Sequence, residues 1–192
     1  MNILIVGVGG QGTILASKIL GAYATLTNQD CKLSEIHGMS QRGGNVVTHV
    51  KMASKVYSPI IGYEEADMIL AFELLEAKRA ISFLKKGKTL LANTQKIYPI
   101  SVASGVALYP NVIKELENSD YKKYYLDALE IAKASGNIKT VNVVMLGAMS
   151  YLLDFDQEKF ICALKETIPS KYIEENLKAY QAGISALKEN KE

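Results

Sequence analysis

A glycine-rich turn joins the first predicted strand to the first predicted helix, and it limits what this chain can fold into. The β-branched apolar run 2–8 predicts a buried strand, and residues 13–26 have apolar side chains at helical spacing. Gly7, Gly9 and Gly12 have the spacing GxGxxG at the junction. In this pattern the first glycine permits a tight turn, the second close approach of a bound group, and the third packing of helix against strand. A strand, glycine turn and helix in this order are typical of α/β folds.

The remaining segments alternate between strand and helix over the first two thirds of the chain. Residues 142–153 are too apolar for a surface helix and too short for a membrane span, so we expect a core helix in which Gly147 permits close packing. Strands are predicted at 31–36, 46–52, 67–72, 89–92 and 102–109, with a turn at 85–88, and helices at 74–84, 111–136, 157–167 and 172–188.

These elements predict an α/β, Rossmann-like fold with a mostly parallel sheet, helices on both faces and a helical C-terminal portion from about residue 111. No linker or internal repeat interrupts the sequence. We therefore expect residues 1–192 to form a single domain.

Composition and charge exclude several classes of function. The 22 Lys and Arg residues against 20 Asp and Glu residues give a net charge of +2, too small to indicate binding to nucleic acid or to an anionic membrane. With no apolar run of about 20 residues and no signal peptide, we expect a cytoplasmic protein with reduced thiols. Cys31 and Cys162 form no CxxC pair, so this chain alone cannot supply the thiolates of a zinc site or an iron–sulfur cluster.

The glycine turn supports two interpretations. Exposed N–H groups at the helix start would attract an anion, and Glu35, at the end of the second predicted strand, is placed to meet the ribose of a dinucleotide. A free-standing NAD(P)-binding Rossmann oxidoreductase is therefore one hypothesis, although the second crossover helix of such folds is missing after Glu35. The alternative is a connection that binds no ligand, with Glu35 an exposed carboxylate at a strand end.

A second glycine-rich loop, EIHGMSQRGG at 35–44, concentrates polar groups of five kinds. Its glycines allow close backbone approach, so Ser40, Gln41 and Arg42 are candidates to hold an anionic group or a partner's carbonyl groups. The alternative is a solvated turn. His37 adjoins no cysteine or second histidine, Ser40 lacks the GxSxG context, and no HExxH motif occurs, so we predict neither a catalytic residue nor a metal site.

Together the two loops resemble the signature loops of the gamma-type domain of the 2-oxoacid:ferredoxin oxidoreductases. Within that family the likeness is greatest to the beta subunits of indolepyruvate ferredoxin oxidoreductases. The resemblance covers nearly the whole chain in order: GVGGQG at 7–12, EIHGMSQRGG at 35–44, DMILAFELLEAKRAISFLKKG at 67–87, PISVASGVALYP at 99–110, NVVMLGAMSYLL at 142–153 and ENLKAYQAG at 175–183.

The resemblance implies an accessory (beta) subunit of a hetero-oligomeric oxidoreductase, inactive alone. Such a complex oxidatively decarboxylates aryl 2-oxoacids such as indolepyruvate, forms the acyl-CoA from coenzyme A and reduces ferredoxin. In the family the thiamine diphosphate, Mg and iron–sulfur clusters belong to the larger alpha subunit. The implied partners are therefore the alpha subunit and, through the complex, ferredoxin, with no cofactor bound by this chain alone.

The positions that match the signature loops are the candidate cofactor-binding or subunit-contact residues, with the phosphates of coenzyme A as one possible ligand. We expect both loops at the carboxyl ends of strands. Arg42 is the main charged contact expected, because the chain has only two arginines and a guanidinium binds phosphate bidentately. A third hypothesis is a non-catalytic module whose loops serve assembly only. The candidates are Gly7, Gly9, Gly10, Gln11 and Gly12 in the first loop, and Gly38, Ser40, Gln41, Arg42, Gly43 and Gly44 in the second.

Overall fold

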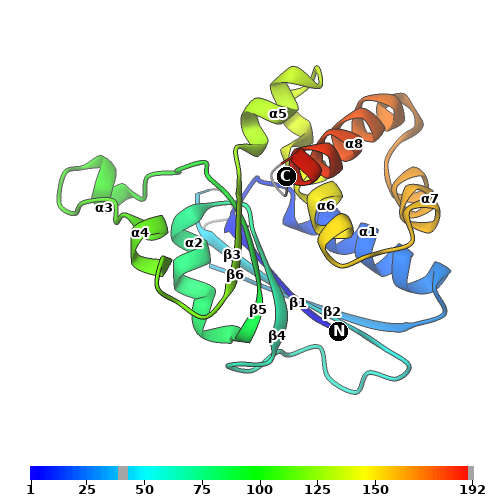
Figure 1. The fold of residues 1–192 in the computed structure, drawn as a ribbon, viewed down its shortest axis with the longest axis horizontal. Helices are drawn as coiled ribbons and strands as arrows, with labels where there is room; N and C mark the ends of the chain where they lie inside the picture. Colours follow the sequence, from blue (N-terminus) through cyan, green and yellow to red (C-terminus); the bar gives the residue numbers. More distant parts are fainter. Residues whose placement is uncertain (39–42, 190–192) are drawn as a thin grey trace.

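The computed structural model describes residues 1–38 and 43–189, and within them six strands form one sheet (Figure 1). The strand order is β2-β3-β1-β4-β5-β6, in which β1, β4, β5 and β6 are parallel and β3 is antiparallel to both of its neighbours. The expected α/β fold with a mostly parallel sheet is confirmed. The strands are β1 (Asn2–Val8), β2 (Asp30–His37), β3 (Asn45–Ala53), β4 (Ala66–Ala71), β5 (Leu84–Asn93) and β6 (Lys122–Leu126).

Helices cover both faces of this sheet, as expected. On one face α1 and α6 pack against the sheet and α7 and α8 pack in turn on them; on the other face α2 packs against the sheet with α4 beside it, whereas α3 projects away from the sheet (Figure 1). The helices are α1 (Thr13–Leu26), α2 (Leu74–Ala80), α3 (Ile100–Ala103), α4 (Val112–Leu116), α5 (Ala128–Ala134), α6 (Val141–Leu152), α7 (Gln157–Thr167) and α8 (Ile173–Glu189), with 3-10 turns at Ile81–Phe83, Ile138–Thr140 and Ser170–Tyr172.

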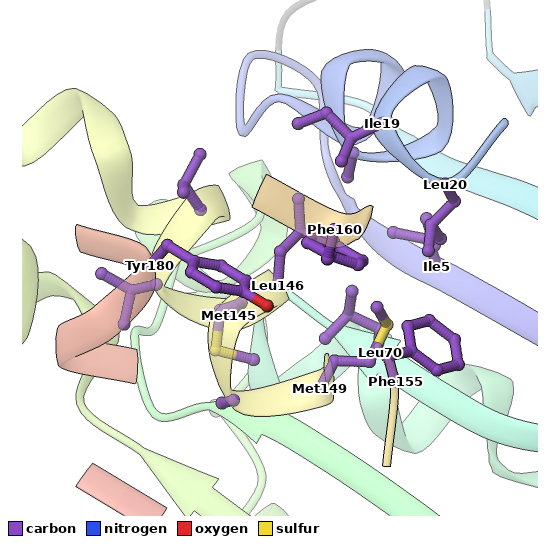
Figure 2. Close-up of a cluster of buried hydrophobic side chains, with 14 of the residues drawn as sticks. Ile5, Ile19, Leu20, Leu70, Met145, Leu146, Met149, Phe155, Phe160 and Tyr180 are labelled. Atoms are coloured by element: carbon purple, nitrogen blue, oxygen red, sulfur yellow. The ribbon is translucent and has the colours of Figure 1, made fainter. Parts of the chain in front are cut away.

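The strand β1 is buried on both faces, which explains its continuous apolar sequence. Ile5 points into the larger core with α1 and α6, while its neighbour Leu4 points into the smaller core with α2. Figure 2 shows the larger core, where the rings of Phe160 and Tyr180 stack with centroids 5.3 Å apart. Because both faces of β1 are apolar, both need a layer of helices, and the three-layer architecture follows.

The segment 111–136, expected to be one helix, forms α4, β6 and α5 instead. Lys123 closes the end of α4 by donating from Nζ to the carbonyl oxygens of Leu116, Glu117 and Ser119 at 3.1, 2.8 and 2.8 Å. The two tyrosines of β6 favour a strand, and β5 offers a free edge with which this segment pairs. Pairing with β5 thus overrides the helical spacing, and the C-terminal portion from about 111 is not wholly helical.

The prediction of a strand at 102–109 is also wrong, because the chain there forms α3 and a return loop outside the sheet. β6 already occupies the edge of β5 that such a strand would need. The turn expected at 85–88 lies inside β5, where the Gly87 N–H donates to the Asp120 carbonyl oxygen at 3.0 Å. The helix expected at 74–84 ends as α2 at Ala80, because β5 begins at Leu84.

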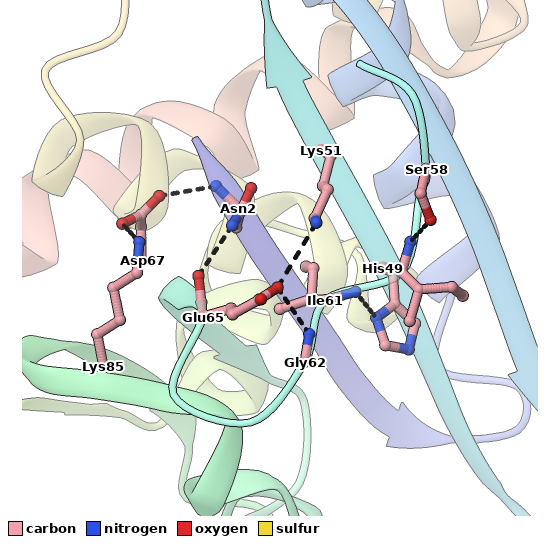
Figure 3. Close-up of polar contacts among 10 residues, drawn as sticks. Asn2, His49, Lys51, Ser58, Ile61, Gly62, Glu65, Asp67 and Lys85 are labelled. Carbon is pink, nitrogen blue, oxygen red and sulfur yellow. Dashed lines mark hydrogen bonds and ion pairs between the residues drawn. The ribbon is translucent and has the colours of Figure 1, made fainter.

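The long connection from β3 to β4, residues 54–65, is held against the sheet by polar contacts (Figure 3). The Ile61 N–H donates to Nδ1 of His49 at 3.1 Å, and Nδ2 of Asn2 donates to the Glu65 carbonyl oxygen at 2.9 Å. His49 is 3% exposed, and burial together with nearby Lys51 lowers its pKa. The imidazole therefore stays neutral and accepts the backbone hydrogen bond, which is a structural role.

The crossing of α6 and α8 requires two glycines. A Cβ added at Gly147 would lie 2.1 Å from the Tyr180 carbonyl oxygen, and one at Gly183 would lie 2.0 Å from the Val144 carbonyl oxygen. The two helix backbones are therefore in direct contact, as expected for Gly147. Close approach places α8 over α6 and keeps the middle of α6 buried on all sides.

Replacing Gly147 with alanine should lower the free energy of unfolding by about 1–3 kcal/mol, because the new methyl group overpacks a backbone contact that cannot relax. Gly21→Ala in α1 is the matched control, since its Cβ would meet only Leu33 Cδ1 at 3.6 Å. That control should be neutral or stabilising by up to about 1 kcal/mol, the helix-propensity difference. Urea unfolding measures both, and equal stabilities of the two variants would contradict the packing argument.

Candidate functional site

The glycine turn lies at the carboxyl end of β1, and Gly12 begins α1 from it. Gly12 has a φ of 84°, in the left-handed region, and a Cβ there would lie 2.4 Å from Nδ2 of Asn142. The same amide group lies 3.4 Å from the Gly12 carbonyl oxygen, to which it donates. Backbone angle and close approach thus both require glycine here, and α6 is fixed against the turn.

The side chain of Gln11 closes the turn from inside. Its Oε1 accepts the Val8 N–H at 2.8 Å, and its Nε2 donates to the Phe72 carbonyl oxygen at 2.9 Å. A Cβ at Gly7 would lie 2.9 Å from the same Oε1, so the first glycine leaves room for this amide. Gln11 therefore joins the ends of β1 and β4 within the protein and satisfies backbone groups that would otherwise be unpaired.

Two residues that the sequence analysis missed extend this network to β5. Asn93 is fully buried, donates from Nδ2 to the Phe72 carbonyl oxygen at 3.2 Å, and accepts the Ala128 N–H at 3.1 Å. Gln95 Oε1 lies 3.5 Å from Nε2 of Gln11. A polar residue directly after an apolar strand was the available signal, because in a parallel sheet such residues gather at one edge.

The two glycine-rich loops meet at this edge, at the carboxyl ends of β1 and β2. The Gly9 N–H donates to the Gly44 carbonyl oxygen at 2.8 Å, so the second loop is hydrogen-bonded to the first. Gly38 and Gly43 are the described residues on either side of positions 39–42. The predicted contacts Ser40, Gln41 and Arg42 lie outside the described residues.

An open pocket of about 340 Å³ lies between the glycine turn, the start of α1 and the end of β2. Glu35 and His37 reach it from one face of β2, since they are two residues apart on a strand. The first turn of α1 contains no acidic residue, so its N-terminal dipole is available to an anion, whereas Glu35 offers an acceptor on the opposite wall. The lining residues are Gly9, Gly10, Gly12, Thr13, Ile14, Glu35, His37 and Val46.

The pocket therefore suits a ligand with an anionic group and separate hydroxyl or amine donors. The first-loop glycines and Glu35 both line this pocket, and the dinucleotide hypothesis requires the same residues together. The strand arrangement differs from that hypothesis, because β3 lies between β1 and β2. Glu35 is thus two strand spacings from β1, about 10 Å, instead of one.

A buried carboxylate, also missed from the sequence, lies at the carboxyl end of β4. Glu73 is 1% exposed and caps α2 by accepting the Glu76 N–H at 3.0 Å. Its other oxygen accepts the Ile97 N–H at 3.2 Å and the Tyr109 hydroxyl at 2.5 Å. Burial and the Glu73 carboxylate raise the pKa of Tyr109, so the phenol remains a donor at physiological pH. Three donors satisfy the carboxylate, and its role is to anchor backbone.

Neither a metal cluster nor a membrane span emerges from the part of the chain that the structure describes. Among residues 1–38 and 43–189, no three His, Cys, Asp or Glu side chains are grouped to hold a metal ion. Within the same ranges, no helix has the length and apolarity to cross a bilayer. Cys31 is half-buried, Cys162 is exposed, and both are free thiols.

Residues 2–186 match the family described as pyruvate ferredoxin/flavodoxin oxidoreductase. The chain belongs to this family. It is 38% identical over 194 residues to the indolepyruvate oxidoreductase subunit IorB of Thermococcus kodakarensis, with 98% of this chain and 96% of the relative covered. Among solved structures, the gamma subunit of a keto/oxoacid ferredoxin oxidoreductase from Geobacter sulfurreducens superposes with a TM-score of 0.72, at 25% identity over 96% of each chain.

One relative carries a segment similar to this chain within a longer polypeptide. The ketoisovalerate oxidoreductase subunit VorA of Methanothermobacter thermautotrophicus is 26% identical over 195 residues, which are 99% of this chain and only 37% of VorA. The relatives thus include both a chain of similar length and one in which the matching segment is joined to further sequence.

Gln11→Ala should lower the free energy of unfolding by about 1–3 kcal/mol, because it leaves the Val8 N–H and the Phe72 carbonyl group without their partner. Amide hydrogen exchange at Val8 should accelerate as the turn loosens. Gln181→Ala, at an exposed position of α8, is the matched control and should stay within about 0.5 kcal/mol. Unchanged exchange at Val8 would mean that the amide does not close the turn.

Proposed function

We propose that this chain is the accessory (beta) subunit of an indolepyruvate:ferredoxin oxidoreductase. The observation that carries the proposal is the 38% identity to an indolepyruvate oxidoreductase subunit over nearly the full length of both chains. The complex would decarboxylate aryl 2-oxoacids oxidatively, with coenzyme A as acyl acceptor and ferredoxin as electron acceptor. This subunit would be inactive alone.

The proposed division of labour between the subunits follows from the family resemblance. Oxidative decarboxylation of a 2-oxoacid and one-electron transfer to ferredoxin both require cofactors, because amino-acid side chains alone do not perform this chemistry. The resemblance to the 2-oxoacid:ferredoxin oxidoreductases implies that thiamine diphosphate, Mg and the iron–sulfur clusters belong to the alpha subunit. The cysteine count agrees with this assignment, since the chain has only two cysteines and no CxxC pair.

The pocket beside the glycine turn is the proposed contact of this chain with coenzyme A or with the alpha subunit near its catalytic centre. The available dipole of α1 supports binding of a phosphate group there. The role of Arg42 is proposed from the sequence alone. Its guanidinium, next to Gly43 and Gly44 in the chain, would pair with a phosphate group.

Co-expression with the long alpha subunit tests the proposed function. The purified pair should reduce viologen or ferredoxin with indolepyruvate and coenzyme A, and a panel of phenyl, hydroxyphenyl and branched 2-oxoacids should show preference for aryl substrates. Each subunit alone is the control and should be inactive. Activity of this chain by itself would contradict the assignment of the chemistry to the partner, and an inactive pair that forms normally would contradict the reaction.

Two charge variants test the proposed use of the pocket. Arg42→Ala should raise the KM for coenzyme A at least about tenfold, the loss of a charge-assisted pair, or weaken assembly. Glu35→Gln should lower that KM severalfold, because it removes a negative charge that repels phosphate while its amide oxygen remains an acceptor. Lys165→Ala, which removes one exposed charge from α7, should change neither value. If the three variants behave alike, coenzyme A does not bind here.

The dinucleotide alternative has one specific observation in its favour, the presence of Glu35 in the same pocket as the first-loop glycines. This alternative predicts the opposite effect of Glu35→Gln, namely weaker binding of the ligand. If the isolated chain binds NADH saturably at micromolar concentration and Glu35→Gln abolishes that binding, the alternative replaces the proposal.

A further inference from the structure

Residues 97–110 form a projecting segment, here named the arm, that includes α3 (Figure 1). The arm contains no charged residue, although 22% of the chain is charged. Three of its aliphatic side chains are almost fully exposed: Ile100 at 88%, Val106 at 82% and Leu108 at 94%. Burial of such side chains is favourable, so the arm displays apolar surface that the described chain does not use.

Hydrogen bonds within the arm give it a defined shape. The Pro99 carbonyl oxygen accepts the N–H groups of Val102 and Ala103, each at 2.9 Å. The returning part of the loop is fixed by the Ala107 N–H, which donates to the Ser101 carbonyl oxygen at 2.9 Å. The exposed aliphatic side chains are therefore presented by backbone that is already folded, which lowers the entropy lost on binding.

Glu73 clamps the base of the arm. One of its carboxylate oxygens accepts from the Ile97 N–H at the start of the arm and from the Tyr109 hydroxyl near its end. The ring of Tyr98 meets that of Tyr109 edge-on, with centroids 5.4 Å apart. A buried carboxylate that holds both ends of a loop keeps the loop in one position on the sheet edge.

The composition of the arm indicates the kind of surface that covers it. The centre of a protein–protein interface is depleted in charged residues, whereas membrane-surface segments carry basic residues beside their apolar side chains. Permanent partners bury more apolar surface than transient ones. In VorA the unit equivalent to this chain is joined to a longer polypeptide, which favours a permanent neighbour.

We propose that the arm docks this chain to the alpha subunit, with Ile100, Val106 and Leu108 in an apolar groove of that subunit. This inference rests on the proposed function, which supplies the partner. The arm leaves the sheet at the edge that carries the glycine turn, because Gln95, two residues before the arm, lies 3.5 Å from Gln11. A partner that holds the arm is thereby positioned beside the pocket.

The test is binding of the full chain to immobilised alpha subunit, together with viologen reduction by the mixture. The triple variant Ile100→Ser/Val106→Ser/Leu108→Ser should raise the Kd at least about 100-fold, as expected on removal of an interface hot spot. Its melting temperature should not change, because these side chains are exposed. Tyr57→Ser/Ile138→Ser is the control, with side chains 89% and 58% exposed elsewhere, and should bind like the unmodified chain.

Each outcome bears on the inference separately from the proposed function. An active complex of the unmodified chain, with the triple variant equally tight, overturns the docking role of the arm and leaves the proposed function intact. Failure of the unmodified chain to bind the alpha subunit overturns both. Loss of self-association, or of binding to phosphatidylglycerol vesicles, in the triple variant with unchanged alpha-subunit affinity also overturns the proposed occupant. If the triple variant melts early, Leu108→Ser alone should still weaken binding at least about tenfold, and unchanged affinity overturns the inference.

Discussion

The buried carboxyl end of β1 imposes the constraint on which the rest of this protein depends. The strand lies between two layers of helices, so polar backbone groups near its end are removed from water and must find partners inside the protein. The amide of Gln11 supplies one donor and one acceptor, and Gly7 leaves the space that the amide occupies. The glycine spacing is thus in part a requirement of strand closure, independent of any ligand.

The GxGxxG motif therefore has a structural role in this protein. In a dinucleotide-binding fold the glycines bring the backbone close to a pyrophosphate. Here Gly7 faces Gln11 and Gly12 faces Asn142, while Gly9 donates to Gly44. Three of the motif's positions are therefore used by the protein's own groups, and the start of α1 remains as the part open to an anion. The pattern predicted the turn and its place on the sheet, but did not distinguish closure from binding.

The sequence predicted elements well where a local pattern and burial agree. β1, α1 and α7 have the bounds that their apolar spacing indicates, and the glycine of α6 has the packing role expected of it. β6 and the arm were missed for one shared reason. Whether a short segment such as 122–126 becomes a strand depends on which segment reaches the free edge of β5, and that competition is decided by tertiary pairing. Once β6 has the edge, residues 102–109 cannot join the sheet.

Part of the candidate site was predictable and part was not, again for physical reasons. Glycines, charged residues and their spacing are visible in a sequence, so the two loops could be expected at one edge of the sheet. Asn93, Glu73 and Gln95 act through partners that are distant in the chain, such as the Ala128 N–H and the Tyr109 hydroxyl. Nothing local marks such residues except a polar side chain directly after an apolar strand, which is also the usual start of a surface loop.

The carboxyl edge of the sheet therefore serves two purposes with one set of polar groups. Gln11 and Asn93 hold the ends of β1, β4 and β5 together, and Glu73 extends that order into the arm. Because each of these side chains is satisfied by groups of the protein itself, mostly of the backbone, the edge is ordered without a ligand, and both the pocket and the arm are presented in defined positions. Under the proposed function, in which the partner would perform the chemistry, this chain would contribute geometry instead of reactive groups, and a rigid edge is the property that such a role requires.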